Sequence, residues 1–342
     1  MFQKIVVPLD GSSLAEQALP VAARLARAGS SSLLLLRIVP PLHQYAWYPV
    51  EPVADLSDLL EQERVRATNY LQGLTSSETL QGIDVSIAVL DGDPADTILS
   101  ATAREQASLI VMCSHGETGF RRWMLGSVSV KVARHSDVPV LVLRPDPHNI
   151  TAPFMSKTGP VRILVPLDGS ERAEESLIPA ARLAQVLSAP EAGALHLACV
   201  IPYENEDQEL AIQLAQEYLV NIEQRLRASE PGKQLTITSS VTLHIDVAQA
   251  LVELAEQGKG MEEIEGFKGC DLIAITTHGR GGVTRWVMGS VTERILDATK
   301  LPLLIIRAHK TREKPAREPE TTTTGQDSTG AGDDPQSWIG LL

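Results

Sequence analysis

One segment of the sequence occurs twice, as Ile5-Val6-Val7-Pro8-Leu9-Asp10-Gly11-Ser12 and, 158 residues later, as Ile163-Leu164-Val165-Pro166-Leu167-Asp168-Gly169-Ser170. In each copy an apolar, largely β-branched run stops at Asp-Gly, so the segment predicts a buried strand followed by a tight turn. A second block repeats near the end of each copy, where the spaced residues His115, Gly116, Gly126 and Ser127 return as His278, Gly279, Gly289 and Ser290. Self-similarity of this extent predicts two domains of the same fold.

Each copy alternates between strand and helix patterns. In the first copy, strands are predicted at 4–9, 32–39, 83–90, 108–112 and 138–143, and helices from Ser13, at 53–74, at 94–104 and at 127–135. Ser13 and Glu16 have the spacing of a capping box, which predicts that the first helix opens there. Strands that are apolar almost throughout are typical of parallel sheets with helices on both faces. The sequence therefore predicts two tandem, doubly wound α/β domains.

The composition changes between and after the two copies. We expect a first domain over residues 1–145, a linker over 146–159 and a second domain over 160–308. Pro, Thr, Gly and charged residues dominate residues 309–342, so a disordered tail is expected there.

The overall composition excludes several classes of protein. The chain has 342 residues and a net charge of −13, which disfavours a nucleic-acid partner. No apolar run reaches the roughly 18 residues of a membrane helix, and the N-terminal sequence does not have the pattern of a signal peptide. Three cysteines are too few for a disulfide framework or a metal cluster. We therefore expect a cytoplasmic protein with no membrane partner.

Two loops of each copy are predicted to form a ligand site. Ligands of open α/β sheets bind beyond the carboxyl ends of the strands, where the strand order reverses. The turn at Asp10 or Asp168 and the glycine loop that ends at Gly126 or Gly289 are expected to meet there. Glycine-loop N–H groups and a helix N-terminus suit a phosphate, and the aspartates suit ribose hydroxyls. Hydroxyl donors are available from Ser127, Ser129, Ser290 and Thr292.

A structural role is the alternative for both loops. Glycines also permit plain tight turns, and an aspartate after a strand can form a turn that caps the next helix. Repetition of the long spaced motif in both copies favours an anion or nucleotide site in at least one of them.

The spaced pattern of Ser/Thr-His-Gly, nine residues and Gly-Ser, with Pro-Leu-Asp-Gly-Ser opening each copy, resembles the universal stress protein family. The resemblance covers roughly residues 1–145 and 160–308. It implies in each domain a five-stranded parallel sheet of order 3-2-1-4-5, an adenine-nucleotide site in one subclass of the family, and pairing of domains through their fifth strands. In that subclass the glycine motif begins with a further glycine, which is replaced here by Cys113 and Thr276.

The same resemblance implies a set of nucleotide-binding residues in each copy. These are Pro8, Asp10, Val39, Met112, Cys113, Gly116, Gly126, Ser127, Val128 and Ser129 in the first, and Pro166, Asp168, Ile201, Ile275, Thr276, Gly279, Gly289, Ser290, Val291 and Thr292 in the second.

The function expected from these features is that of a stress-response protein that binds ATP or a related adenine nucleotide and acts as a sensor or regulator. Magnesium is expected to accompany ATP. The alternative is a nucleotide-free module that works through protein partners, which the replaced first glycines support. A homodimer of the whole chain is compatible with the sequence.

An enzyme is the third interpretation. The chain lacks Gly-x₄-Gly-Lys-Ser/Thr, and its first loop lacks the Ser-Gly-Gly-x-Asp-Ser type of signature found in ATP pyrophosphatases. We therefore expect no catalytic residues, and at most slow, incidental hydrolysis of ATP.

Overall fold

The structure of the chain is a computed structural model that describes residues 2–41, 56–114, 126–144, 159–203, 207–261, 267–277 and 288–308. The predicted linker, apart from Gly159, and the predicted tail lie outside the described residues. So do most residues of both glycine loops, including Gly116 and Gly279.

Both copies contain strands and helices in alternation. The first copy comprises β1 (Lys4–Leu9), α1 (Ser13–Glu16), α2 (Ala18–Gly29), β2 (Ser32–Val39), α3 (Leu56–Thr75), the 3₁₀ turn η2 (Glu78–Leu80), β3 (Val85–Asp91), α4 (Pro94–Arg104), β4 (Leu109–Cys113), α5 (Ser127–His135) and β5 (Val140–Leu143). The second comprises β6 (Arg162–Pro166), α6 (Glu171–Glu174), α7 (Leu177–Ser188), β7 (Ala194–Ile201), α8 (Gln208–Ala228), β8 (Thr236–Leu243), α9 (Val247–Gln257), β9 (Leu272–Thr276), α10 (Ser290–Ala298) and β10 (Leu303–Ile306).

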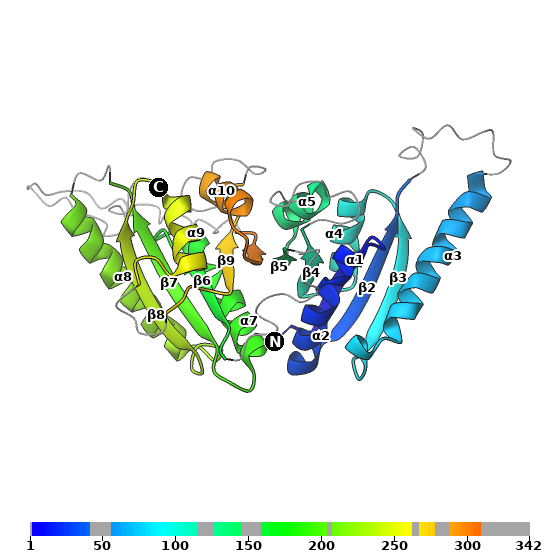
Figure 1. Ribbon diagram of the computed structural model, residues 1–342, viewed down its shortest axis with the longest axis horizontal. Coiled ribbons are helices and arrows are strands. Elements are labelled where there is room, and N and C mark those ends of the chain that lie inside the picture. Colours follow the sequence, from blue (N-terminus) through cyan, green and yellow to red (C-terminus); the bar gives the residue numbers. More distant parts are fainter. Residues whose placement is uncertain are drawn as a thin grey trace, which may run out of the picture.

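The strands form one sheet in the order β3-β2-β1-β4-β5-β10-β9-β6-β7-β8. All strand pairs within each copy are parallel, so each half has the order 3-2-1-4-5 and the predicted fold class is confirmed. The two halves join where β5 and β10 pair antiparallel, with Leu141 opposite Leu304. Figure 1 shows the halves side by side, with α3 and α8 at the outer ends. Because the central pair is antiparallel, the carboxyl ends of the strands in the two halves face opposite edges of the sheet.

Apolar side chains alternate between the two faces of the sheet. Ile5 and Val7 belong to the layer covered by α1–α3 and α6–α8, whereas Val6 belongs to the layer covered by α4, α5, α9 and α10. This period of two follows from strand geometry, since successive side chains point to opposite faces. Both faces of the sheet are therefore covered, as the apolar strands predicted.

The first helix differs from its prediction in two ways. Its N-cap is Ser12 and not Ser13: the Ser12 Oγ accepts a hydrogen bond of 3.1 Å from the Ala15 N–H. The helix also breaks at Gln17, because Pro20 has no N–H to donate to the Glu16 carbonyl, which lies one turn earlier. Pro179 occupies the same place after the break between α6 and α7. The break is thus a feature of the repeat.

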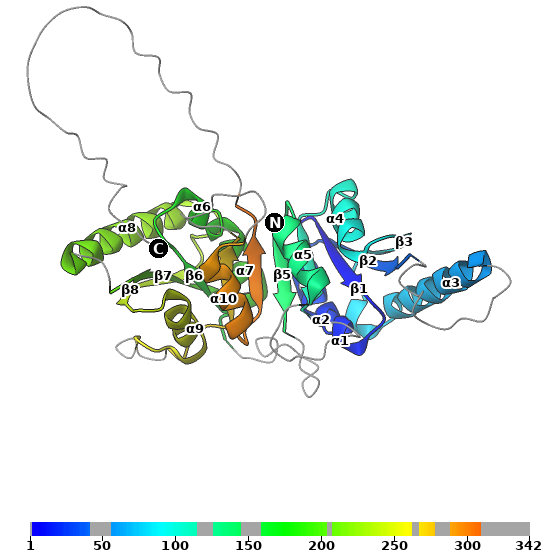
Figure 2. The same cartoon turned by 90° about the horizontal axis from the view of Figure 1, so that it is seen from above.

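Polar contacts flank the central strand pair. Arg134 of α5 forms a 3.2 Å ion pair with Glu293 of α10, and these helices lie side by side in Figures 1 and 2. Arg307 forms a 2.7 Å ion pair with Asp137, and Arg24 of α2 donates to the Leu187 carbonyl of α7. Partly exposed ion pairs stabilise by only about 0–1 kcal/mol each, so the apolar β5–β10 pair contributes most of the joint.

The second half contains a buried histidine, His196, at a position where the first half has a leucine. His196 of β7 is 0% exposed, and its ring nitrogens bond the hydroxyls of Thr238 (2.8 Å) and Ser240 (2.9 Å). Burial, aided by the positive charge of Arg162, lowers the pKa of His196 to about 4. Leu34 occupies the same register in β2, so the charge-capable ring is specific to the second copy.

Truncating the central strand pair is expected to destabilise the protein. Leu304 and Leu141 are both 0% exposed, so Leu304→Ala should lower the free energy of unfolding by about 2–5 kcal/mol, as buried Leu→Ala changes do. Urea denaturation measures this loss. Val220→Ala is the control, because Val220 is 52% exposed and its loss should change stability by no more than about 0.5 kcal/mol. Equal effects of the two changes would contradict the buried pairing.

Acid is expected to destabilise the second half through His196. An unfolded histidine binds a proton below about pH 6.5, whereas His196 in the folded protein does so only near pH 4. The free energy of unfolding should therefore fall as the pH drops through this window, by on the order of 3 kcal/mol in total. Urea denaturation between pH 4 and 7 measures it. In His196→Leu, which copies Leu34, this part of the pH dependence should vanish; an unchanged slope would refute the assignment.

Candidate functional site

The turns after β1 and β6 have the same hydrogen bonds in both copies. Asp10 Oδ1 accepts from the N–H (3.0 Å) and the hydroxyl (2.6 Å) of Ser12, and Asp168 Oδ1 accepts likewise from Ser170 (3.0 and 2.6 Å). Each serine in turn accepts from a backbone N–H of the following helix. Both aspartates thus build the turn, which is the structural role considered for them, and the turn holds each carboxylate at the carboxyl end of its strand.

Glycine is needed in these turns. Gly11 has φ of +87° and Gly169 has φ of +81°, a conformation that other residues adopt only with strain. The glycines keep the backbone beside each aspartate free of side-chain bulk.

The helices that follow the glycine loops begin without a side-chain cap. Gly126 and Gly289 are the N-caps of α5 and α10, and neither residue makes a side-chain capping hydrogen bond to the first turn of its helix. By contrast, Asp93 caps α4 and Asp246 caps α9. The first-turn N–H groups of a helix carry partial positive charge, so an uncapped N-terminus at this edge of the sheet suits an anion.

Hydrogen bonds fix the two uncapped helices to the ends of β4 and β9. Gly126 N–H donates to the Ser114 carbonyl (2.7 Å), and Gly289 N–H donates to the Thr277 carbonyl (2.8 Å). The buried Ser129 hydroxyl donates to the carbonyls of Ser114 (2.9 Å) and Gly126 (2.8 Å), and Thr292 Oγ1 donates to the Thr276 carbonyl (2.9 Å).

The four predicted hydroxyl donors therefore divide into two kinds. The hydroxyl hydrogens of Ser129 and Thr292 are used within the protein, so these residues position their helices. Ser127 and Ser290 are exposed at the first positions of α5 and α10. Only this second pair lies where a hydroxyl can reach a ligand in front of the helix.

The residues that replace the first glycine of the motif point into the protein. Cys113 is 7% exposed, its Sγ lies 3.8 Å from the Ala15 carbonyl of α1, and burial raises the pKa of this thiol to about 12. Thr276 is 5% exposed. Neither side chain lies out over the end of its strand, so a ligand there meets backbone. Met112 and Ile275, one position earlier, are likewise buried.

The predicted base-flanking residues lie at the ends of neighbouring strands. Val39 ends β2 and Ile201 ends β7, and each is 4% exposed. Pro8 and Pro166 lie near the ends of β1 and β6. Val128 and Val291 are partly buried in the first turns of α5 and α10. Leaving aside Gly116 and Gly279, all predicted residues of each copy come from the carboxyl ends of the strands and the helix that follows them.

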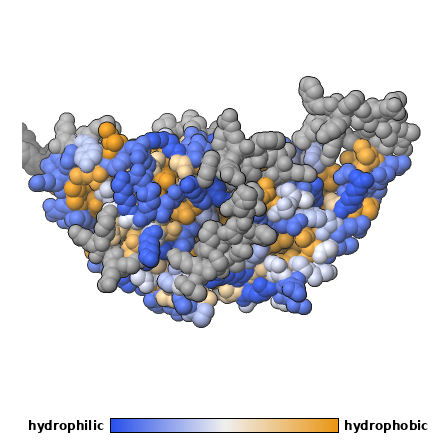
Figure 3. All heavy atoms as spheres, viewed as in Figure 1, coloured by the Kyte–Doolittle hydropathy of each residue, from blue (hydrophilic) through white to orange (hydrophobic). Residues whose placement is uncertain are grey.

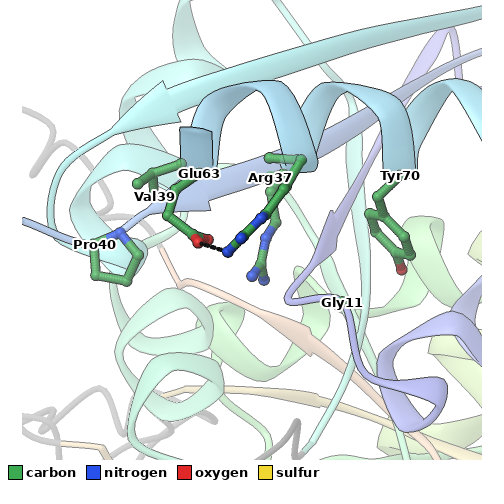
Figure 4. A pocket seen from close by; sticks show the side chains of 8 residues that line it. Gly11, Arg37, Val39, Pro40, Glu63 and Tyr70 are labelled. Atoms are coloured by element: carbon green, nitrogen blue, oxygen red, sulfur yellow. Dashed lines mark hydrogen bonds and ion pairs between the residues drawn. The ribbon is translucent and has the colours of Figure 1, made fainter. Parts of the chain in front are cut away.

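A pocket beside the first-copy turn includes residues that the sequence analysis missed. It has a volume of about 160 Å³ and is lined by Gly11, Arg37, Val39, Pro40, Glu63, Arg66, Ala67 and Tyr70. In Figure 4, Arg37 of β2 lies between Glu63 and Tyr70 of α3. Arg37 is the single charged residue of β2, which is apolar apart from it and Ser32, and the α3 residues follow helical spacing of three and four. These two sequence patterns could have pointed to the pocket residues.

Tyrosines anchor α3 and α8 to the turns in the same way. The Tyr70 hydroxyl donates to Glu16 (2.9 Å), and the Tyr218 hydroxyl donates to Glu174 (3.2 Å). Burial and the neighbouring carboxylate raise the pKa of both tyrosines. Each hydroxyl is therefore neutral and oriented, and it sets the position of the long helix beside the site.

The structure also bears on metal ions, membranes and protein surfaces as partners. The described residues contain no group of three or more His, Cys, Asp or Glu side chains arranged to hold a metal ion. Within the described ranges, no helix has both the length and the hydrophobicity that crossing a membrane requires. On the face seen in Figure 3, hydrophobic residues lie in small, separated groups among hydrophilic ones.

Comparison with known families identifies the class of protein. The model of the universal stress protein family matches residues 1–144 and again residues 161–307. The chain therefore belongs to the universal stress protein family and carries its domain twice, which confirms the resemblance found in the sequence.

Relatives match either one domain or the whole chain. A universal stress protein of Methanocaldococcus jannaschii is 30% identical over 145 residues, covering 42% of this chain and 83% of the relative. One of Mycolicibacterium smegmatis is 23% identical over 325 residues, covering 89% and 96%. The crystal structure of a universal stress protein from Archaeoglobus fulgidus has the same fold, with a TM-score of 0.61, 20% identity, and coverage of 89% of this chain and 98% of that one.

Removing the buried hydroxyl of α5 tests its positioning role. Ser129→Ala deletes the hydrogen bonds to Ser114 and Gly126, so the free energy of unfolding should fall by about 1 kcal/mol in urea denaturation. Ser127→Ala is the matched control: this serine is exposed two positions earlier, and its loss should leave stability within about 0.5 kcal/mol. A stable Ser129→Ala protein would argue that the hydroxyl does not hold the helix.

Proposed function

We propose that the protein is a cytoplasmic stress-response sensor or regulator that binds ATP, or a related adenine nucleotide, at the carboxyl ends of β1 and β4 and of the equivalent strands β6 and β9. The observation that carries this proposal is the pair of glycine-capped helices, α5 and α10, next to the aspartate turns. Asp or Ser side chains cap α1, α4, α6 and α9, whereas the N-caps of α5 and α10 are glycines, which have no side chain to occupy the first-turn N–H groups that an anion would bind.

The residues of each site suit different parts of a nucleotide. In the first copy, Gly126, Ser127 and the first turn of α5 would hold the phosphates, and Asp10 would accept from ribose hydroxyls. Pro8 and Val39 would contact the base at the ends of β1 and β2. The buried side chain of Cys113 leaves the strand end open to backbone approach, which weakens the argument for a nucleotide-free module.

Magnesium enters this proposal with the nucleotide. Mg²⁺ is usually bound through one or two carboxylates plus substrate phosphates rather than by a cage of protein ligands. The lack of a three-carboxylate group in the described part of the chain is compatible with that mode. The phosphates and one aspartate would then supply the ligands.

The proposed role is binding rather than fast turnover. The described residues around each turn pair Asp with Ser in a structural hydrogen bond, which does not create an activated nucleophile. Any hydrolysis of ATP would be slow. We also propose that the β5–β10 joint makes one chain equivalent to a dimer of single domains, and that whole chains pair further as a homodimer.

Capping the two helices with aspartate tests the phosphate site. Gly126 (φ −63°, ψ 152°) and Gly289 (φ −60°, ψ 142°) have a conformation that aspartate adopts at N-caps without strain. In Gly126→Asp/Gly289→Asp the new carboxylates should accept from the first-turn N–H groups and repel phosphate. The melting temperature without ligand should stay the same or rise, and the shift caused by ATP and Mg²⁺ should be lost.

The rise in melting temperature that ATP causes in the native protein is the reference for the variants. At a hundred times its dissociation constant, ATP should add about 2.7 kcal/mol, or roughly 5–10 °C, to thermal stability. GTP and AMP test the choice of nucleotide, and Gly126→Asn/Gly289→Asn supplies a cap of similar size without charge. A full ATP shift in the aspartate variant would eliminate the phosphate site. Absence of any shift in the native protein would favour the nucleotide-free module.

A further inference from the structure

The pocket beside Gly11 is charged in the first copy only. Each pocket residue has a counterpart in the second copy. The strand registers identify the counterparts on β2 and β7, and the Tyr70–Glu16 and Tyr218–Glu174 hydrogen bonds identify those on α3 and α8. The uncharged lining is alike in the two copies, with Gly11, Val39, Pro40, Ala67 and Tyr70 matched by Gly169, Ile201, Pro202, Ala215 and Tyr218.

The three charged residues of the pocket all differ. Arg37, Glu63 and Arg66 are matched by Cys199, Ala211 and Leu214. Cys199 is 4% exposed and its Sγ lies 3.1 Å from the Leu167 carbonyl, the counterpart of the Leu9 carbonyl that Arg37 faces. The uncharged lining of the pocket is thus alike in the two copies, and the two copies differ in its charged residues.

The guanidinium of Arg37 uses few of its hydrogen-bond donors within the described residues. Among the described residues it makes one hydrogen bond, a long one of 3.5 Å from Nη1 to the Leu9 carbonyl. Glu63, the acidic residue of the pocket, is already paired with Arg66 at 2.6 Å. The three side chains together carry one net positive charge. A partly buried guanidinium with spare donors is suited to bidentate binding of a phosphate.

The place of Arg37 in the fold indicates which phosphate this would be. Arg37 lies near the carboxyl end of β2, and its Cζ is 3.7 Å from where a Cβ of Gly11 would be, so it borders the turn after β1. Gly11 directly follows Asp10, to which the proposed function assigns the ribose hydroxyls, so Arg37 would border the ribose. In dinucleotide-binding domains of the doubly wound class, an arginine near the ribose accommodates a phosphate on its 2′ oxygen. In the proposed site the phosphates on the 5′ oxygen would lie at the N-terminus of α5, which follows β4, two strands from β2.

We propose that Arg37 makes the first copy selective for adenine nucleotides that carry an additional phosphate on the ribose, at the 2′ or the 3′ oxygen. This inference rests on the proposed nucleotide site. The second copy, with Cys199 in place of Arg37, lacks the selectivity and binds the unmodified ribose. The chain therefore has two sites of the same fold and different ligand preference.

Isothermal titration calorimetry of the full chain with AMP, adenosine 2′,5′-bisphosphate and adenosine 3′,5′-bisphosphate tests the proposal. One bisphosphate should bind about tenfold to a hundredfold more tightly than AMP, as expected for a charge-assisted hydrogen-bonded pair, with one tight site per chain. The 2′ and 3′ compounds identify the oxygen that carries the phosphate. The advantage should shrink as salt is raised.

Arg37→Gln should abolish the advantage of the bisphosphate, so that the ratio of its dissociation constant to that of AMP in the same variant approaches one. Arg104→Gln is the charge-matched control, because Arg104 belongs to α4 on the opposite face of the sheet, and it should keep the advantage. Native protein that binds AMP and both bisphosphates equally, or Arg37→Gln that retains the preference, would overturn the inference and leave nucleotide binding intact. Failure of all three nucleotides and of ATP to bind would instead remove the proposed function.

Discussion

The antiparallel pairing of β5 with β10 is the constraint on which the rest of the molecule depends. It joins two parallel half-sheets into one and places buried Leu141 against Leu304. The same pairing turns the two halves in opposite directions, so the proposed sites at the carboxyl ends of their strands lie at opposite edges. Helices α5 and α10 accompany the joint and also begin at those edges. Stability and the placement of both sites therefore have one origin.

The proposed sites consist of backbone more than of side chains. Glycines at the turns and N-caps give positive φ or an uncapped helix, while buried hydroxyls of Ser129 and Thr292 fix the helices to the strand ends. An anion site of this kind needs no lysine or arginine to be complete. Charged side chains such as Arg37 are then free to differ between copies without disturbing the frame.

Much of this arrangement could be predicted from the sequence, because local patterns determine it. The strands at 4–9 and 32–39 and the helices at 94–104 and 127–135 have the predicted bounds. Apolar runs define the strands, and Asp93-Pro94 and Gly126-Ser127 mark the starts of the helices. The cap at Ser12 was misassigned to Ser13, because Ser13 and Glu16 have capping-box spacing and the hydrogen bond from the Ala15 N–H to Ser12 Oγ is seen only in the structure. The pocket was missed because Arg37 and Tyr70 are brought together only by packing of α3 on β2. Sequence patterns within one strand or one helix do not show which helix packs against which strand.

Duplication within one polypeptide has a consequence for how the two copies can diverge. In a dimer of identical chains, every residue near the twofold axis and every residue of a site must serve both subunits at once. Here the covalent link holds the halves together at any protein concentration, and position 37 can be arginine while its counterpart is Cys199. With the two proposed sites, a single chain would combine two unlike inputs, each on its own edge of the sheet, in a fixed ratio of one to one.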